Sequence, residues 1–233
     1  MLRHMLNSHP DVRCHGEVMT GRGLDALAGV DRDADPSVTC ALMDRRRSDP
    51  RGFLEEVVLD PGPAKAVGFK IKYEELLLPD YAWLLEWLKS HREIRVIHLT
   101  RENRLKRLIS EVTATKVYGL YNVTSESERP RAARISLSLE ECLEDFARTE
   151  EREALFQGYF EDRELLRTTY EAIVSDRADV RSRLTQFLGV PPAALTTPTL
   201  KLNPDDLRGV LEDYEALAAA LQGTRYAVYF LGR

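Results

Sequence analysis

One stretch of the chain concentrates the side chains best suited to hold a small anion. The segment Arg92–Arg107 carries six basic residues against two acidic ones, a net of +4, in a chain whose formal net charge is −5. Guanidinium and ammonium groups hold phosphate and sulfate through charge-assisted hydrogen bonds. The segment therefore predicts a binding site for a small anion within an otherwise acidic protein. Its basic residues are Arg92, Arg95, Arg101, Arg104, Lys106 and Arg107.

Within this segment, Arg101 and Ser110 are the candidates to hold a phosphate between them. Arg101 directly follows an apolar run that reads as a strand, and Ser110 lies nine residues later, inside a helix expected from Glu102 to about residue 116. Ligands of parallel α/β folds bind at the carboxyl ends of strands, and helix amino termini attract anions. The alternative is a solvated helix start, with ion pairs to Glu102 or Glu111.

The elements around these residues predict an α/β fold. A strand–helix–strand–helix order is typical of a parallel sheet covered by helices. At 233 residues, with no internal repeat and no recognisable linker, the chain is expected to form one domain, residues 1–233. The apolar patterns place strands at residues 65–72, 95–100 and 165–170, and helices at 53–59, 79–89, 102–116, 139–164, 178–188 and 205–221.

The amino-terminal region predicts one helix and then loops. Met1, Leu2, Met5 and Leu6 follow helical spacing until Pro10. A polar loop is expected at residues 11–20, and a glycine- and charge-rich stretch at 21–50 with one short helix near 24–28. No capping residue precedes the first helix and no strand leads into it, so we expect that something upstream of Met1 is missing.

Composition excludes several classes of protein. The acidic net charge argues against a protein that coats nucleic acid or an anionic membrane. No apolar run approaches the roughly 20 residues of a membrane span, and no signal peptide is recognisable, so a cytoplasmic protein is expected. Cys14, Cys40 and Cys142 show neither disulfide nor zinc spacing and are expected to be reduced thiols.

Three segments in register resemble the sulfotransferases that use 3′-phosphoadenylyl sulfate (PAPS). Residues 99–110 (LTRENRLKRLIS) resemble the strand-to-helix element that binds the donor's 3′-phosphate. Residues 1–17 resemble the first helix and loop of bacterial carbohydrate sulfotransferases and tyrosylprotein sulfotransferases. The carboxyl-terminal third, from Tyr170-Glu171 through Lys201–Pro204 to Tyr226, is similar to the bacterial branch. Together these segments cover most of the chain.

The resemblance implies a P-loop-like sheet and a set of site residues. Arg101 and Ser110 match the positions that hold the 3′-phosphate, and Lys70 could neutralise the bridging oxygen as the bond breaks. Glu17 falls where the tyrosylprotein branch places its catalytic base, with His15 as the rival base. Sulfuryl transfer needs no metal. The acceptor is expected to be a hydroxyl of a carbohydrate or glycolipid, and the oligomeric state is left open.

The resemblance also implies a difference from the family. Its members carry a strand and a glycine- and serine-rich loop that cradles the 5′-phosphosulfate immediately before the first helix. Here the first helix opens the sequence. We therefore expect little or no turnover from the chain as given. The alternative to an enzyme is a catalytically inactive remnant of the fold that retains at most nucleotide binding. A scaffold that binds a partner through the acidic segment 139–164 is a further alternative.

Overall fold

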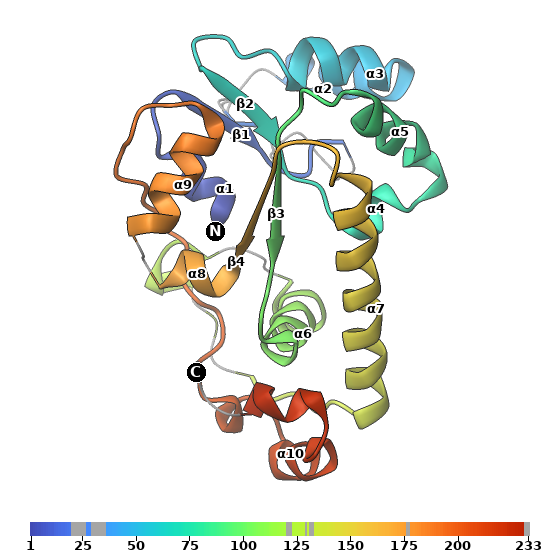
Figure 1. The fold of residues 1–233 in the computed structure, drawn as a ribbon, viewed down its shortest axis with the longest axis vertical. Helices are drawn as coiled ribbons and strands as arrows, with labels where there is room; N and C mark the ends of the chain where they lie inside the picture. The colour runs from blue at the N-terminus through green and yellow to red at the C-terminus, as the bar shows by residue number, and fades with distance from the viewer. Residues whose placement is uncertain are drawn as a thin grey trace. The chain divides into compact units, whose positions relative to one another are not determined.

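The chain forms two compact units in the computed structural model (Figure 1). The first unit contains Met1–Ile97, Tyr159–Leu166 and Ala172–Thr197, and the second contains His98–Gly158, Arg167–Glu171 and Pro198–Arg233. The structure describes residues 1–19, 27–28, 36–119, 123–128, 130, 133–175 and 178–230. Among these residues the strands are short and helices flank them, so the broad α/β prediction is confirmed.

The first unit is built on a parallel pair of strands. β1 (Val12–His15) pairs with β2 (Ala66–Phe69), and the register runs from Val12 opposite Ala66 to His15 opposite Phe69. The strand expected at residues 65–72 is confirmed. The polar loop expected at 11–20 is interrupted by β1, in which Val12 and Cys14 alternate with Arg13 and His15, while residues 16–19 are irregular. This period of two turns the first pair toward the core, and four residues are too few for the pattern to stand out.

Helices surround this pair of strands. They are α1 (Leu2–Asn7), α2 (Pro36–Ser48), α3 (Pro50–Phe53), α4 (Tyr73–Leu76), α5 (Ala82–Ser90) and α9 (Ala178–Leu188). α1 lies between β1 and α9 in Figure 1, and its Met5 and Leu6 pack against Val180 and Leu184. The helices predicted at 1–9, 53–59, 79–89 and 178–188 are confirmed, the second as α3 continued by a π-helical turn, Leu54–Val58.

The glycine-rich stretch at 21–50 differs from its prediction. α2 covers thirteen residues of it, Pro36–Ser48, where only loop was expected. The run Arg45–Arg47 falls in its last turn, where basic side chains are favourable to the helix dipole. The short helix expected near 24–28 lies mostly outside the described residues. The glycine and charge content of residues 21–50 predicted loops, but it did not reveal that residues 36–48 form a run compatible with a helix.

A second pair of strands joins the units in sequence. β3 (Val96–Thr100) pairs with β4 (Leu165–Thr169), and their arrows point the same way in Figure 1. Each strand begins in the first unit and ends in the second. Their carboxyl ends are followed by Arg101 and by α8 (Tyr170–Val174), respectively. The two described sheets are thus both two-stranded, and the strands predicted at 95–100 and 165–170 are confirmed.

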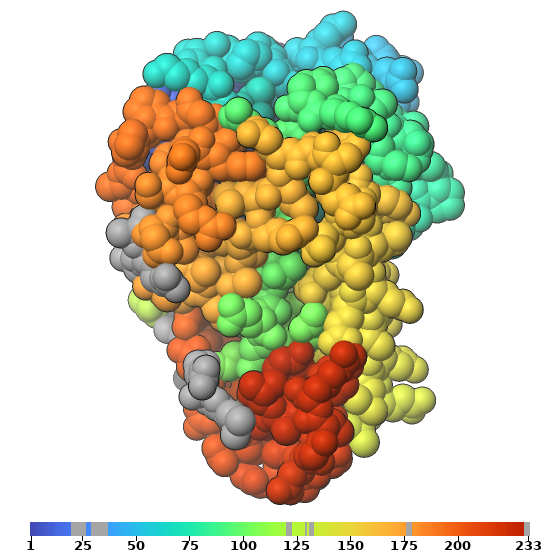
Figure 2. Space-filling model, in the orientation of Figure 1, coloured from blue at the N-terminus to red at the C-terminus, as the bar shows by residue number. Residues whose placement is uncertain are grey.

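The second unit is a helical cluster around one apolar core. α6 (Arg104–Val112), α7 (Leu139–Tyr159) and α10 (Tyr214–Leu221) supply most of its buried side chains. Phe146 of α7 lies 5.0 Å from the ring of Tyr226 and 5.2 Å from that of Tyr229. In Figure 2 the red carboxyl-terminal segment fits against the green and yellow surfaces of α6 and α7. α7 is one helix that stops at Tyr159, five residues before the predicted end.

The helix expected over 205–221 forms only in its second half. A 3-10 turn, Leu207–Gly209, precedes α10, and the intervening backbone pairs with Ile135 instead of continuing a helix. Ile135 donates to the carbonyl of Val210 at 2.8 Å, and its own carbonyl accepts from Glu212 at 3.0 Å. These bonds use the groups that a helix would need, so the apolar spacing of the segment could not reveal the interruption.

The acidic face of α7 is only partly solvated. Asp145 is buried and forms ion pairs with Arg107 of α6 and with Arg148. Glu150 and Glu153 pair with Arg104, which is also on α6. Part of the acidic face therefore neutralises the cations of α6, which also removes those carboxylates from any partner-binding surface.

Arg163 caps the end of α5 in the first unit, and its loss should destabilise that unit. Its side chain is 1% exposed, and its guanidinium donates to the carbonyls of Leu88 (2.5 Å), Lys89 (2.9 Å) and His91 (3.0 Å). Arg163→Ala leaves these carbonyls without their donor, so we expect a loss of about 2–4 kcal/mol in urea unfolding. Arg92→Ala, an exposed cation paired with the same Asp162, should change stability by less than about 0.5 kcal/mol. Equal effects would contradict a capping role.

Asp145 should be equally sensitive in the second unit. Asp145→Ala leaves the partly buried Arg107 guanidinium without its closest carboxylate, so we expect a loss of about 3 kcal/mol in urea unfolding. Glu144→Ala removes the same charge from an exposed neighbour on α7 and should stay within about 0.5 kcal/mol. A loss at Asp145 no greater than at Glu144 would show that the buried pair contributes nothing.

Candidate functional site

Arg101 lies at the carboxyl end of β3, where the neighbouring strand also ends. Its guanidinium stacks on the ring of Tyr170, 4.4 Å from the centroid, and Tyr170 directly follows β4. The Arg101 side chain is only 20% exposed, and its buried Nε atom has no hydrogen-bond partner. Burial lowers the pKa of Arg101, and Tyr170 and Glu171 partly offset it. The result is a fixed cation with spare hydrogen-bonding capacity.

The amino terminus of α6 is occupied by a carboxylate of the protein itself. Glu171 accepts hydrogen bonds from the backbone N–H groups of Glu102 (2.9 Å) and Asn103 (3.4 Å). The Asn103 side chain caps the helix by accepting from Lys106 N at 2.9 Å. Glu171 also lies 3.7 Å from Arg101 Nε. The carboxylate at this helix start is neither of the acidic residues considered from the sequence, Glu102 and Glu111.

One face of α6 carries Lys106, Ser110 and Thr113. These positions are spaced four and three residues apart and so lie on the same side of the helix and its continuation. The segment after Leu200 contacts this face: Asn203 Nδ2 donates to Thr113 Oγ1 at 2.9 Å, and Lys106 Nζ lies 3.8 Å from Asp205 Oδ1. The residues on either side of Ser110 on this face, Lys106 and Thr113, therefore both contact the carboxyl-terminal segment.

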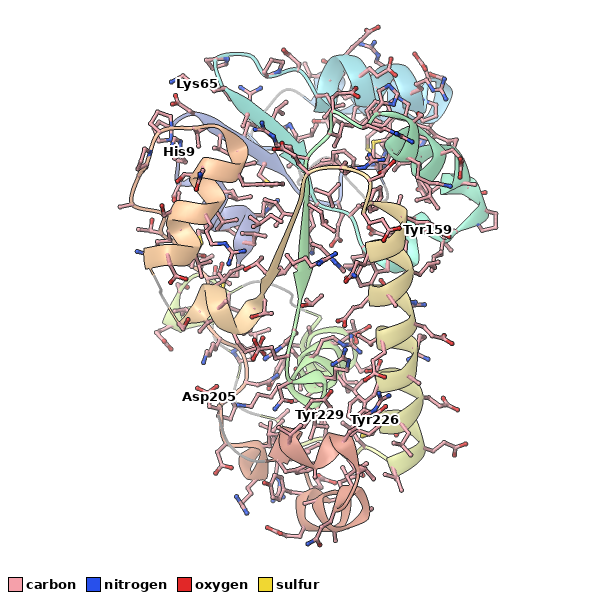
Figure 3. All side chains as sticks on the ribbon, viewed as in Figure 1. His9, Lys65, Tyr159, Asp205, Tyr226 and Tyr229 are labelled. Carbon is pink, nitrogen blue, oxygen red and sulfur yellow. The ribbon has the colours of Figure 1, made fainter. Side chains whose placement is uncertain are left out.

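Asp205 interacts with several cations of this surface. Its two oxygens lie 3.0 and 2.9 Å from Lys201 Nζ, in addition to the Lys106 contact. The hydrogen bond from Lys201 lowers the pKa of Asp205; desolvation opposes this shift, and the charges of Lys201, Lys106 and Arg101 add to it. Arg101, Lys106 and Lys201 thus act on one carboxylate. In Figure 3, Asp205 lies beside α6, on the side away from α7 in that view.

The predicted pair Glu17 and Lys70 is brought together in the first unit. Lys70 follows β2 and donates to Glu17 Oε1 at 2.5 Å, and Lys72 Nζ lies 3.4 Å from Glu17 Oε2. Lys70 N also donates to the carbonyls of His15 (3.0 Å) and Gly16 (3.3 Å), which extends the β1–β2 pairing up to the glutamate. The parallel register of the two strands is therefore what places this carboxylate beside two ammonium groups.

Electrostatics keep Glu17 ionised. Burial by itself would raise the pKa of Glu17, but the hydrogen bond and charge of Lys70, with Lys72, outweigh it and hold the pKa below its ordinary value of 4.5. Because the folded-state pKa is lowered, these contacts stabilise the fold above pH 4.5 and are lost as the pH falls through the folded value. Near neutrality the carboxylate is available to accept a proton.

His15 lies in a different environment from Glu17. Its ring is buried, and Nδ1 accepts a hydrogen bond from Ala28 N at 2.9 Å. Burial, aided by the charge of Arg13, lowers the pKa of His15 to about 4. The imidazole is therefore neutral at physiological pH and engaged with the backbone, which is a structural position for a histidine.

The positive charge of the segment 92–107 is divided among many partners. In the first unit Arg92 pairs with Asp162 and Arg95 with Glu164. In the second, Arg104 and Arg107 pair with the carboxylates of α7. Of the six basic residues, Arg101 and Lys106 share one carboxylate, that of Asp205, among their interaction partners. The predicted anion site is thus narrowed to these two cations and to Lys201 from the carboxyl-terminal segment.

The sequence did not identify four residues of this surface as site residues. Tyr170 and Glu171 were noticed only within the resemblance, although their position directly after a strand repeats that of Arg101 and could have paired the two. Lys106 was counted in the basic cluster without a role, and Asp205 was given none. Its spacing of four residues from Lys201 carries no signal outside a helix, because that spacing brings side chains together only on a helical backbone.

Comparisons with protein families, with curated proteins and with solved structures gave no match to this chain. In the part of the chain that the structure describes, no helix is both long and apolar enough to cross a membrane. The same residues contain no cluster of three or more His, Cys, Asp or Glu side chains placed to hold a metal ion. The three cysteines are free thiols.

Replacing Lys70 should raise the pKa of Glu17. Lys70→Met removes the positive charge closest to Glu17, so less remains to offset the effect of burial. The pKa of the Glu17 carboxyl should therefore rise above its wild-type value. Carbon-detected NMR of the side-chain carboxyl measures this directly. Lys65→Met, which removes the ammonium paired with Asp11 at 2.8 Å, should leave Glu17 unchanged. An unmoved Glu17 in the Lys70 variant would contradict the coupling.

Proposed function

We propose that the chain is a sulfotransferase that moves a sulfuryl group from PAPS to a hydroxyl of a carbohydrate or glycolipid acceptor. The observation that carries the proposal is the position of Arg101, a fixed cation at the carboxyl ends of two strands that interacts electrostatically with Asp205. Lys106, which contacts Asp205, shares one helix face with Ser110. Such a surface suits the phosphate group that PAPS carries at its 3′ position. A P-loop-like sheet is part of the proposal, supported by the short strands and their flanking helices.

Sulfuryl transfer requires stabilisation of the charge on the leaving group and a general base. The acceptor oxygen forms a bond to sulfur as the bond between sulfur and the bridging oxygen of the donor breaks, and that oxygen leaves with the electron pair on adenosine 3′,5′-bisphosphate. The acceptor proton passes to Glu17, and Lys70 neutralises the leaving oxygen. Contact between Glu17 and Lys70 supports both roles.

Glu17 suits the role of base better than His15 does. Glu17 is ionised at neutral pH and its side chain is 25% exposed, so an acceptor hydroxyl can reach it. His15 is 2% exposed and its Nδ1 is occupied by a backbone N–H group. When Lys70 turns toward the leaving oxygen, Glu17 loses its closest cation and becomes a stronger base, which couples the two steps.

Binding of the donor's product tests the proposal. We expect calorimetric titration of the folded chain with adenosine 3′,5′-bisphosphate to saturate, and Arg101→Ala to weaken binding by about tenfold or more, because a charge-assisted contact to phosphate is lost. Ser110→Ala should weaken binding less. Arg92→Ala, with the same charge change in the first unit, should bind like wild type. A folded wild-type chain that binds no bisphosphate would overturn the proposal.

A transfer assay separates the enzyme from its alternative. Radioactive PAPS with a panel of saccharide and glycolipid acceptors reports sulfuryl transfer directly. Glu17→Gln should retain bisphosphate binding and lower any wild-type transfer by about 10²- to 10⁴-fold, the contribution of a general base. Saturable binding without transfer by wild type would favour the alternative, a fold that keeps the nucleotide site without activity.

A further inference from the structure

We propose that Asp205 is an internal counter-ion of the phosphate site, which the phosphate group of a ligand displaces from Lys106 and Lys201. The inference rests on the proposed function and deepens it. It says which group neutralises the cations of the site when no ligand is bound, and which further cations bind the phosphate. It adds Lys106 and Lys201 to Arg101 as the groups that hold the phosphate. It also makes Asp205 a determinant of affinity that never touches the reacting atoms.

The geometry of Asp205 is that of an anion in an anion site. Both of its oxygens lie within 3.0 Å of Lys201 Nζ, Oδ1 lies 3.8 Å from Lys106 Nζ, and Arg101 interacts with it electrostatically. These three cations come from the residue after β3, from α6 and from the segment after Leu200, so their convergence is a tertiary feature. A phosphate monoester carries up to two negative charges and three oxygens, and it satisfies such a set better than one carboxylate does.

Exposure indicates which carboxylate yields to the ligand. The Asp205 side chain is 72% exposed, and its contacts described above are with lysine ammonium groups and the charge of Arg101. Glu171, the other carboxylate near Arg101, is 31% exposed and accepts from two backbone N–H groups at the start of α6. Displacing Glu171 would leave those donors unpaired, whereas water can replace the lysines around Asp205.

The backbone around Asp205 is anchored independently of its carboxylate. Leu200 N donates to the carbonyl of Val123 at 2.8 Å, and Asn203 donates to Thr113. The Asp205 side chain can therefore turn away while Lys201 stays next to α6. In the empty site the carboxylate keeps Lys106 and Lys201 close together, so the ligand meets cations that are already in position.

The counter-ion has a consequence for turnover. The 3′-phosphate is common to the donor and to the bisphosphate product, so any cation that binds the donor also retains the product. A carboxylate that returns to Lys106 and Lys201 lowers the free-energy cost of emptying the site. Product release limits the rate of many enzymes. Asp205 therefore trades affinity for faster release.

The test compares Asp205→Asn with a matched control. We expect calorimetry to show that Asp205→Asn binds adenosine 3′,5′-bisphosphate about three- to tenfold more tightly than wild type, because a competing negative charge is removed from the site. Glu212→Gln removes the same charge from an exposed position of the second unit and should change affinity by less than about twofold. Adding Lys201→Met to Asp205→Asn should cancel the gain. Thermal unfolding confirms that each variant is folded.

The outcomes separate this inference from the proposed function. Wild-type binding that Asp205→Asn leaves equal or weaker would overturn the counter-ion while the nucleotide site stands. A gain at Asp205→Asn that is the same for adenosine 5′-monophosphate would support the counter-ion and overturn the assignment of the site to a 3′-phosphate. A gain in affinity of similar size in Glu212→Gln would show that the effect comes from net charge alone and would overturn the inference.

Discussion

The second unit depends on neutralising the cations of α6. Arg104 and Arg107 project from a short helix into a partly buried environment, where an unpaired charge would be costly. Carboxylates of α7 satisfy them and fix how α7 packs. Asn103, at the start of α6, donates to the carbonyl of Tyr229 at 2.9 Å and so connects the carboxyl-terminal segment to the same helix. The face with Lys106 and Ser110 is left for other contacts, and this is the face to which the function is assigned.

The first unit also neutralises buried or partly buried charges, on a smaller scale. Its parallel pair of strands ends with a glutamate from one strand and two lysines from the other, and the register of β1 and β2 determines that they meet. The carboxylate stays ionised because the lysines outweigh the effect of burial on its pKa. In both units a short strand pair therefore delivers charged residues to its carboxyl end, as parallel α/β architecture generally does.

Much of the framework followed from local pattern. The long apolar periodicities of α5, α7 and α9 and the β-branched or apolar runs of β2, β3 and β4 each identify an element without reference to the rest of the chain. β1 and α2 were missed because four residues, or a charged run without a strong apolar stripe, provide too little periodic signal. The tail before α10 was predicted as helix because apolar spacing does not reveal that its backbone groups pair with Ile135.

The sequence by itself determined which residues could do chemistry: Arg101 after a strand, Ser110 in the following helix, Glu17 and Lys70. Only the tertiary structure decided which charges remain for a ligand, because an ion pair depends on distance in space and the partners lie far apart along the chain. Arg104 and Arg107 are paired across to α7, and Glu171 occupies the helix start that local reasoning gave to a ligand. Asp205, which also pairs with Lys201, reaches Lys106 from nearly a hundred residues away. Local net charge counts residues, whereas binding depends on the field that remains after the fold has paired them.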